Sequence, residues 1–145
     1  MHIRVPQFCI LLFALATGAC SVPNLESPAC TEARTFARQF YSFHFANDMA
    51  PSPEGLRARE RFLTPEYYNE LVEALNERSV IDPFTGSHPP PTAFRIGKCE
   101  SKADKAVFEV QLFWRTDEIS TQKEVDISLV KAGDRWLVSQ VGSLF

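Results

Sequence analysis

The spacing of apolar residues changes once along this chain of 145 residues, at a proline-rich segment covering residues 82–92. Before it, apolar residues recur every three or four positions, which is typical of amphipathic helices. After it, they alternate with polar residues, which is typical of half-buried strands. Four prolines and one glycine exclude a helix or a central strand from the segment itself. A helical half followed by a stranded half predicts an α+β fold.

Three helices are predicted in the first half. Ser27-Pro28 is typical of a helix start, because serine caps the free N–H groups and proline fits the first turn. A shorter helix follows over Glu54–Phe62, and Thr64-Pro65-Glu66 begins the third. The apolar stripe of the first helix contains Ala29, Ala33, Phe36, Ala37, Phe40, Phe43 and His44, and that of the third contains Tyr68, Leu71, Val72 and Leu75.

About four strands are predicted in the second half, joined by short turns, so an antiparallel meander is expected. In the first strand, Phe94, Ile96 and Lys98 alternate with Arg95, Gly97 and Cys99. The last strand contains Trp136–Val138 and Val141. The inward positions of the two middle strands are apolar: Phe108, Val110, Leu112, Trp114, Val125, Ile127 and Leu129. We expect one face of the sheet to pack against the helices.

The N-terminus has the pattern of a secretory signal. An unbroken apolar run covers Phe8–Ala16, which is too short to span a bilayer but fits the apolar region of a signal peptide. Small residues follow it and lead to Cys20. We therefore divide the chain into a signal peptide over residues 1–19, a flexible spacer over residues 20–28 and one α+β domain over residues 29–145.

The segment Ala16-Thr17-Gly18-Ala19-Cys20 resembles the lipobox of bacterial lipoproteins, although Thr17 stands where that pattern usually has leucine. The resemblance implies that Cys20 is acylated and becomes the first residue of a membrane-tethered protein. In such lipoproteins, a residue such as Ser21 implies sorting to the outer membrane, here facing the periplasm. The alternative is an ordinary signal peptide cut after Ala19.

Cysteine usage favours the lipoprotein reading. The chain has four cysteines, and Cys9 leaves with the signal peptide. If Cys20 carries lipid, Cys30 and Cys99 remain as one pair in an oxidising compartment. Their disulfide would close a loop of about 70 residues and contribute up to about 4 kcal/mol in the chain-entropy model. Two buried free thiols, or a bridge between Cys20 and Cys30, are the alternatives.

The order of elements resembles the nuclear-transport-factor-two-like fold, in particular bacterial lipoproteins of unknown function with that domain. The segments that carry the resemblance are residues 36–41, 62–66, 82–84, 94–97 and 131–138. It implies a cone-like domain in which helices pack on a curved sheet. The same architecture serves isomerases, dehydratases, transport adaptors, immunity proteins and binding domains, so it does not fix a function.

The resemblance implies an acid–base site for an isomerase, with an aspartate base and a tyrosine in the cone. The loosest equivalents are Tyr41, Tyr68 and Asp82. Because the predicted inner face of the sheet carries no carboxylate, we expect no enzymatic activity. His44 and His88, the histidines left after processing, lack the spacing of metal ligands, so neither metal nor cofactor is expected.

Two groups of residues are candidates for binding. Five aromatic residues would line a cavity in the cone, or else fill it as a core: Phe36, Phe40, Tyr68, Phe108 and Trp114. Four residues of the proline-rich segment would contact a protein partner, or else cover the open end of the cone: Asp82, Phe84, His88 and Pro90.

Charge excludes one class of partner. The formal net charge is −3, and it becomes −4 when Arg4 leaves with the signal peptide. No basic cluster is present in the sequence, so nucleic acid is not an expected partner. The sequence therefore predicts a lipid-anchored, non-enzymatic envelope protein that binds another protein. The alternatives are a carrier or sensor of a small apolar ligand and, third, a cone-type isomerase or hydrolase.

Overall fold

The computed structural model describes residues 25–75, 80–118 and 120–142. The signal peptide, Cys20 and most of the predicted spacer lie outside the described residues. Three helices come first: α1 (Pro28–Phe45), α2 (Pro53–Arg59) and α3 (Pro65–Leu75), with a 3-10 turn η1 (Glu60–Phe62) before α3. Four strands follow: β1 (Ala93–Lys102), β2 (Lys105–Arg115), β3 (Ser120–Ala132) and β4 (Arg135–Val141).

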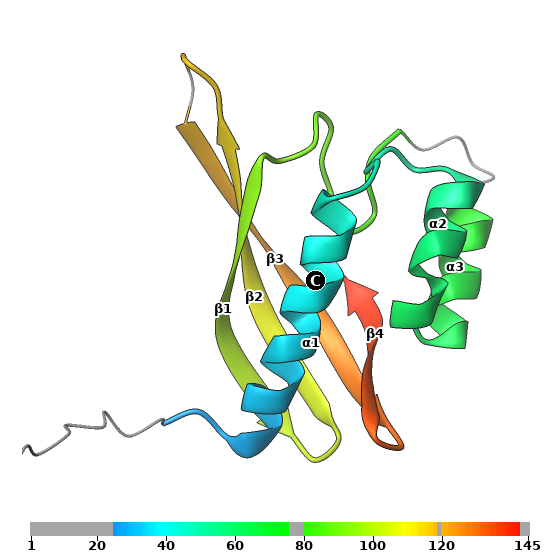
Figure 1. The fold of residues 1–145 in the computed structure, drawn as a ribbon, viewed down its shortest axis with the longest axis vertical. Helices are drawn as coiled ribbons and strands as arrows, with labels where there is room; N and C mark the ends of the chain where they lie inside the picture. The colour runs from blue at the N-terminus through cyan, green and yellow to red at the C-terminus, as the bar shows by residue number, and fades with distance from the viewer. Residues whose placement is uncertain (1–24, 76–79, 119, 143–145) are drawn as a thin grey trace, which may run out of the picture.

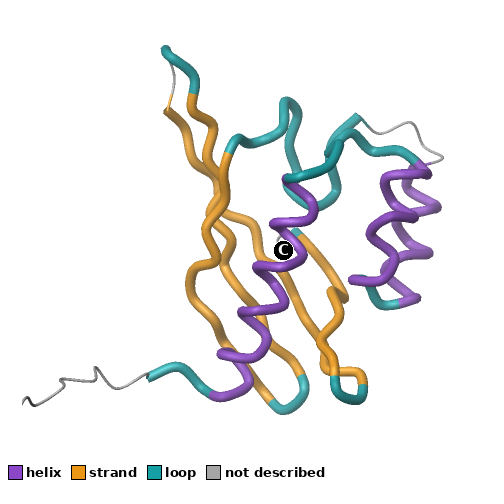
Figure 2. The backbone as a smooth tube through the Cα atoms, in the orientation of Figure 1, coloured by secondary structure: helices purple, strands orange, loops and turns teal. Residues whose placement is uncertain are grey.

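The strands form one antiparallel sheet in the order β1-β2-β3-β4, so the predicted meander and the α+β class are confirmed. Figure 1 shows α1 crossing one face of the curved sheet, with α2 and α3 side by side beyond β4. The tube in Figure 2 shows the same layering. No helix among the described residues is long and apolar enough to cross a membrane.

Helix α1 begins as predicted, with the Ser27 hydroxyl accepting a hydrogen bond from the Cys30 N–H and Pro28 in the first turn. Its buried side is rotated from the predicted stripe, because Tyr41 is fully buried whereas Phe36 and Phe43 are half-buried. The buried side of α3 also differs from the predicted stripe. Tyr67 and Leu71 are buried, while Val72 is 38% exposed.

The inner face of β2 and β3 is apolar as predicted: Phe108, Val110, Leu112, Val125, Ile127 and Leu129 are buried, and Trp114 is half-buried at the end of β2. The alternation predicted for the first strand is wrong after Ile96. The register shifts between Ile96 and Cys99, which is a β-bulge. The bulge turns Cys99 to the side of the sheet where α1 lies.

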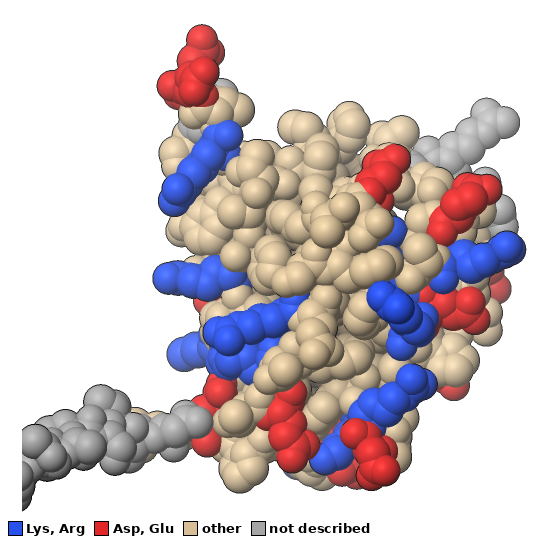
Figure 3. Space-filling model, in the orientation of Figure 1, with Lys and Arg blue, Asp and Glu red and all other residues tan. Residues whose placement is uncertain are grey.

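The surface in Figure 3 mixes both signs of charge. Basic side chains gather over α1 and β1, and a second group lies over the lower end of α2, with acidic side chains nearby. The end of the domain that holds the first turn of α1 is called the tether end. The opposite end, where α1 stops beside residues 46–51 and the proline-rich segment, is called the loop end (Figure 1).

Candidate functional site

The loop end is built around a tight turn of the proline-rich segment. The Gly86 N–H donates to the Asp82 carbonyl at 2.8 Å, and the Asp82 N–H donates to the Ser87 carbonyl at 3.3 Å. Gly86 has a φ of 59°, a conformation that suits glycine because it has no Cβ. Inside the turn, one oxygen of the Asp82 carboxylate accepts from the Phe84 N–H at 3.0 Å. The turn therefore points the Asp82 side chain into the protein, where it is 2% exposed.

A buried chain of hydrogen bonds runs from Arg59 through His44 to Asp82. The Arg59 Nε donates to His44 Nδ1 at 2.7 Å, and His44 Nε2 lies 2.8 Å from Asp82 Oδ2. Because an arginine is always protonated and only donates, Nδ1 must be the acceptor and Nε2 must carry the proton. His44 is therefore a neutral imidazole that donates to Asp82. The Thr85 hydroxyl also donates to Asp82 Oδ2, at 2.6 Å.

This network joins a buried guanidinium and a buried carboxylate through a neutral ring. Arg59 is 3% exposed, and burial lowers its pKa, while the Asp82 and Asp48 carboxylates act in the opposite direction. Arg59 also donates to the carbonyls of Gly55 at 2.7 Å and Asp48 at 2.9 Å. The network thereby fastens α1, the 46–51 loop, α2 and the 82–87 turn to one another. Its polar atoms bond within the protein, which is the arrangement of a structural clamp rather than of a reactive site.

Phe84 is the apolar anchor of the same turn. The centroid of its ring lies 5.2 Å from that of Phe40 and 5.1 Å from that of His44. The Phe84 carbonyl accepts a hydrogen bond from the Tyr41 hydroxyl at 2.9 Å. Burial raises the pKa of Tyr41 well above its usual range, and the pKa of Tyr67 is raised for the same reason. The anchored turn closes this end of the core.

The structure divides the four predicted partner-binding residues into two pairs. Asp82 and Phe84 are 2% and 3% exposed, so both side chains are buried and neither offers the exposed contact surface that was predicted, although Asp82 forms part of the wall of a hollow at this end. The cause is the tight turn, which directs both side chains inward, as in the alternative prediction of a cover over the cone. His88 and Pro90 are exposed. These two residues are available to another molecule.

An open hollow of about 610 Å³ lies between the two loops at this end, and we call it the loop hollow. Its walls are mostly apolar, and the buried Arg59–His44–Asp82 network holds the two loops in place. It is lined by Asn47, Asp48, Met49, Ala50, Pro51, Val80, Asp82, Ser87, His88 and Pro90. Val80 is 66% exposed, and Ile81 beside it is 50% exposed, which is unusual for large apolar side chains in this domain.

The five aromatic residues predicted to line a cavity do not lie around one space. Phe40 and Phe108 are fully buried in the packed core. Phe36 borders a hollow beside β4, Tyr68 borders another beside α2, and Trp114 donates to the Pro89 carbonyl at 2.9 Å. The space beneath the 46–51 loop measures about 20 Å³, which is room for about one water molecule. The core is filled as in the alternative prediction.

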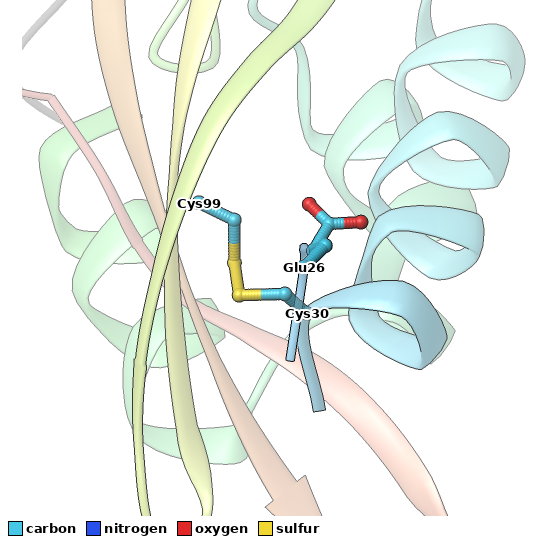
Figure 4. A group of neighbouring side chains, drawn as sticks. All are labelled: Glu26, Cys30 and Cys99. Carbon is cyan, nitrogen blue, oxygen red and sulfur yellow. A yellow bond between two sulfur atoms is a disulfide. The ribbon is translucent and has the colours of Figure 1, made fainter. Parts of the chain in front are cut away.

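At the tether end, Cys30 and Cys99 form the predicted disulfide, with their Cα atoms 6.0 Å apart. Glu26 lies beside them, and Figure 4 shows the three side chains together. The grouping does not make a metal site, because the two sulfurs are bonded to each other and Glu26 pairs with Arg34. That arginine lowers the pKa of Glu26. Its Nη1 also donates to the carbonyls of Ile96 and Gly97 at the bulge, at 3.0 and 2.9 Å.

Sequence reasoning missed the Arg59–His44–Asp82 network. It placed His44 at the edge of the core and did not single out Arg59. The partners are separated by 15 and 38 residues, and no local pattern joins them. One signal was present: Asp82 followed by Pro83 and by Thr85 at the third position is typical of a turn whose side chain bonds its own backbone.

Three helices packed with a curved four-stranded antiparallel sheet make an α+β fold, as predicted, and its solved neighbours include an Ntf2-like structure. No family model and no curated protein matches the chain. Solved structures do match. A chain of the type VI effector–immunity complex Tae3–Tai3 from Ralstonia pickettii is 14% identical with a TM-score of 0.61, over 77% of this chain and 94% of that one.

Two further structures share the fold. A protein of unknown function from Bacteroides thetaiotaomicron is 16% identical, with a TM-score of 0.58 over 78% of this chain and 90% of that chain. The Ntf2-like, potential transfer protein TraM from the Gram-positive conjugative plasmid pIP501 is 11% identical, with a TM-score of 0.51 over 79% and 96%. Identities this low establish a shared fold and leave function to be argued from the site.

Proposed function

We propose that this chain is a lipid-anchored protein of the bacterial cell envelope that binds another protein through the loop hollow and has no enzymatic activity. The observation that carries the proposal is the position of the hollow. An open, mostly apolar surface lies at the end of the domain opposite to the start of α1, on loops that the Arg59–His44–Asp82 network holds in place. Exposed apolar surface on a rigid support is typical of protein-binding sites.

The length of α1 separates the two ends. Its 18 residues correspond to about 27 Å at 1.5 Å per residue. A tether at Cys20 would enter the domain at the first turn of α1, so the loop hollow would face away from the membrane surface (Figure 1). Acyl chains on Cys20 would then hold the protein on a lipid leaflet, and we place that leaflet in the outer membrane, facing the periplasm.

The disulfide supports export. Bonds of this kind persist in oxidising compartments such as the periplasm and are rare in the cytosol. Cys30 and Cys99 are joined in the structure, which is consistent with a chain that leaves the cytoplasm behind its signal peptide.

Two structural neighbours support protein binding as a use of this fold. One is a chain of an effector–immunity complex, and another is a potential transfer protein of a conjugative plasmid. The absence of enzymatic activity is supported by the network at the loop end. The nitrogen atoms of the His44 ring and the oxygens of the Asp82 carboxylate bond to protein groups, so neither residue presents a free base to a substrate.

The test is site-specific photo-crosslinking in the native envelope. A benzoylphenylalanine placed at His88 or at Pro90, on the rim of the loop hollow, should give a discrete crosslinked species that mass spectrometry identifies as one protein. The matched control places it at Lys102, an exposed residue at the end of β1, beside the β1–β2 turn at the tether end. Equal crosslinking from all three positions, or none from the loop end, would show that the loop hollow is not the binding surface.

A further inference from the structure

Three arginines from three different elements surround a second hollow on the domain. Arg57 lies in α2, Arg61 in η1 and Arg135 at the start of β4, and they line a space of about 580 Å³. We call this the arginine hollow. Arg57 and Arg135 are 78 positions apart in the sequence, so the absence of a basic run in the sequence did not exclude a basic cluster in the fold.

These guanidinium groups have no acidic partner among the residues that the structure describes. The ion pairs found there join Glu26 to Arg34 and Glu32 to Lys131, and Asp82 accepts a hydrogen bond from the neutral His44. Arg61 instead stacks on the rings of Phe43 and Phe62, with 4.8 Å to each centroid. Glu60 is the one acidic residue in the lining. With three arginines and one glutamate in its lining, the hollow is locally positive on a chain whose formal net charge is −3.

The arginine hollow has a fixed, apolar floor. Leu63 and Leu137 line it and are 4% and 7% exposed, and Tyr68 stands half-buried beside them. The Thr64 N–H donates to the Val138 carbonyl at 2.8 Å, which ties the start of α3 to β4. The elements that carry the arginines are thus held together before any ligand arrives, which lowers the entropic cost of binding.

We propose that the arginine hollow binds an acidic segment of the protein partner, with aspartate or glutamate carboxylates pairing with Arg57, Arg61 and Arg135. A guanidinium matches a carboxylate with two parallel hydrogen bonds, and an unpaired surface arginine is ready to form them. The buried leucine floor adds room for an apolar side chain of the same segment. This inference rests on the proposed function, because it gives the chemistry of that partner.

The two hollows suit one partner. Helix α2 begins at Pro53, next to the 46–51 loop of the loop hollow, and its last turn carries Arg57 of the arginine hollow. Its seven residues span about 10 Å at the helical rise. An interface of ordinary size, about 800 Å² on each partner, covers both ends of such a helix.

The test measures binding of an acidic peptide to the full chain purified from membranes. The probe is a fluorescein-labelled hexapeptide that alternates glutamate and leucine, followed by anisotropy at about 50 mM salt. Replacing the three arginines (R57Q, R61Q and R135Q together) should weaken binding at least about tenfold, because charge-assisted pairs are lost. The double variant R57Q/R135Q spares the stacked Arg61 and should give a smaller loss, provided that its unfolding midpoint is unchanged.

The matched control makes the same change of net charge elsewhere. The substitutions K98Q, K102Q and K105Q remove three exposed lysines of β1 and β2, and they should weaken binding less than about twofold. Equal losses in the control and in the arginine variants would overturn the proposal, and so would a wild-type chain that does not bind the peptide. Soluble dihexanoyl phosphatidylglycerol serves as a competitor. If it binds more tightly than the peptide with the same arginine dependence, the hollow is a lipid headgroup site and the proposal fails.

Crosslinking separates this inference from the proposed function. If the partner is captured from Pro90 equally well in the wild type and in the arginine variants, the arginine hollow is not part of the interface, while binding at the loop hollow stands. If no partner is captured from the loop end at all, the proposed function fails, whatever the peptide does.

Discussion

At the residue scale, the position of one proton explains how a charged group is tolerated at the loop end. His44 accepts a hydrogen bond from Arg59 and donates one to Asp82. Its neutral ring therefore links the buried guanidinium to the buried carboxylate, which do not contact each other directly. An isolated buried charge is strongly unfavourable, and a chain of satisfied hydrogen bonds removes most of that cost. Each member of the network is therefore needed by the others.

We predict that D82A lowers the free energy of unfolding by about 3–5 kcal/mol. The substitution removes the larger of the two counter-charges that act on the buried Arg59 guanidinium, and it leaves the His44, Thr85 and Phe84 donors without their shared acceptor. D82N keeps the shape and one acceptor oxygen, so we expect a smaller loss. Urea unfolding measures both. The exposed Asp117 is the control, and D117A should change the free energy by less than about 0.5 kcal/mol. If D82A also lowered the free energy of unfolding by less than about 0.5 kcal/mol, the network would not be important for stability.

The buried tyrosines predict a loss of stability in alkali. Burial raises the folded-state pKa of Tyr41 and Tyr67 above the usual value near 10, so above that pH the unfolded chain binds fewer protons than the folded one. The free energy of unfolding should then fall by about 1.4 kcal/mol per pH unit for each tyrosine. In Y41F the decrease per pH unit should be smaller by about 1.4 kcal/mol, because one of the two buried tyrosines is absent. Urea unfolding between pH 9 and 11.5 measures the slope, and parallel curves for the two proteins would contradict the prediction.

At the scale of elements, the β-bulge and the disulfide depend on each other. Strict alternation from Ile96 would turn Cys99 to the outer face of the sheet, away from α1. The bulge changes this, and Gly97 permits it, because a Cβ there would lie 3.1 Å from the Glu109 carbonyl oxygen. Arg34 then occupies the carbonyls that the bulge frees. One glycine thus positions the cysteine that joins the first helix to the edge of the sheet.

Removing that covalent link should destabilise the domain. The disulfide joins residues 69 positions apart, and for such a separation the chain-entropy model gives about 4 kcal/mol. We predict that the double variant C30A/C99A loses stability of this order in urea. Dithiothreitol should lower the stability of the wild type by a similar amount and leave the variant unchanged. A wild type that is insensitive to complete reduction would contradict the prediction.

The sequence was sufficient to predict the helices and strands, but it was not sufficient to predict which side of each helix is buried. The change of apolar spacing around residues 82–92 predicted three helices and four strands because periodicity is a local property. The buried sides of α1 and α3 differ from the prediction because the burial of Tyr41 and Tyr67 depends on contacts with distant residues such as Phe84. The bulge, the loop hollow and the arginine hollow arise from contacts between distant segments, which no local pattern records.

At the scale of the whole molecule, the proposed lipid anchor would orient the domain so that the loop hollow faces away from the membrane. The proposed tether would enter beside Cys30, and the loop hollow lies at the far end of α1 (Figure 1). A domain held at one end presents the other end to the aqueous space. In this proposal the attachment depends on the acyl groups of Cys20.

The anchor is therefore tested at Cys20. We predict that the wild type is recovered from membranes with the mass of a chain that begins at Cys20 and carries acyl groups. C20S should instead appear in the soluble periplasmic fraction, because the acyl chains that provide durable attachment are absent. Intact mass spectrometry and cell fractionation measure both. A full-length wild-type chain in the cytosol, with Met1 still attached, would contradict export as well as anchoring.

The place of the disulfide has a mechanical consequence. Cys30 is the third residue of α1, so tension applied through the N-terminal segment reaches the sulfur bridge before it reaches the rest of the helix. The load would pass directly into β1, and the remaining turns of α1 would carry little of it. Under stretching the reduced protein should yield by peeling α1 from the sheet one turn at a time. The oxidised protein should resist until β1 itself is pulled from β2.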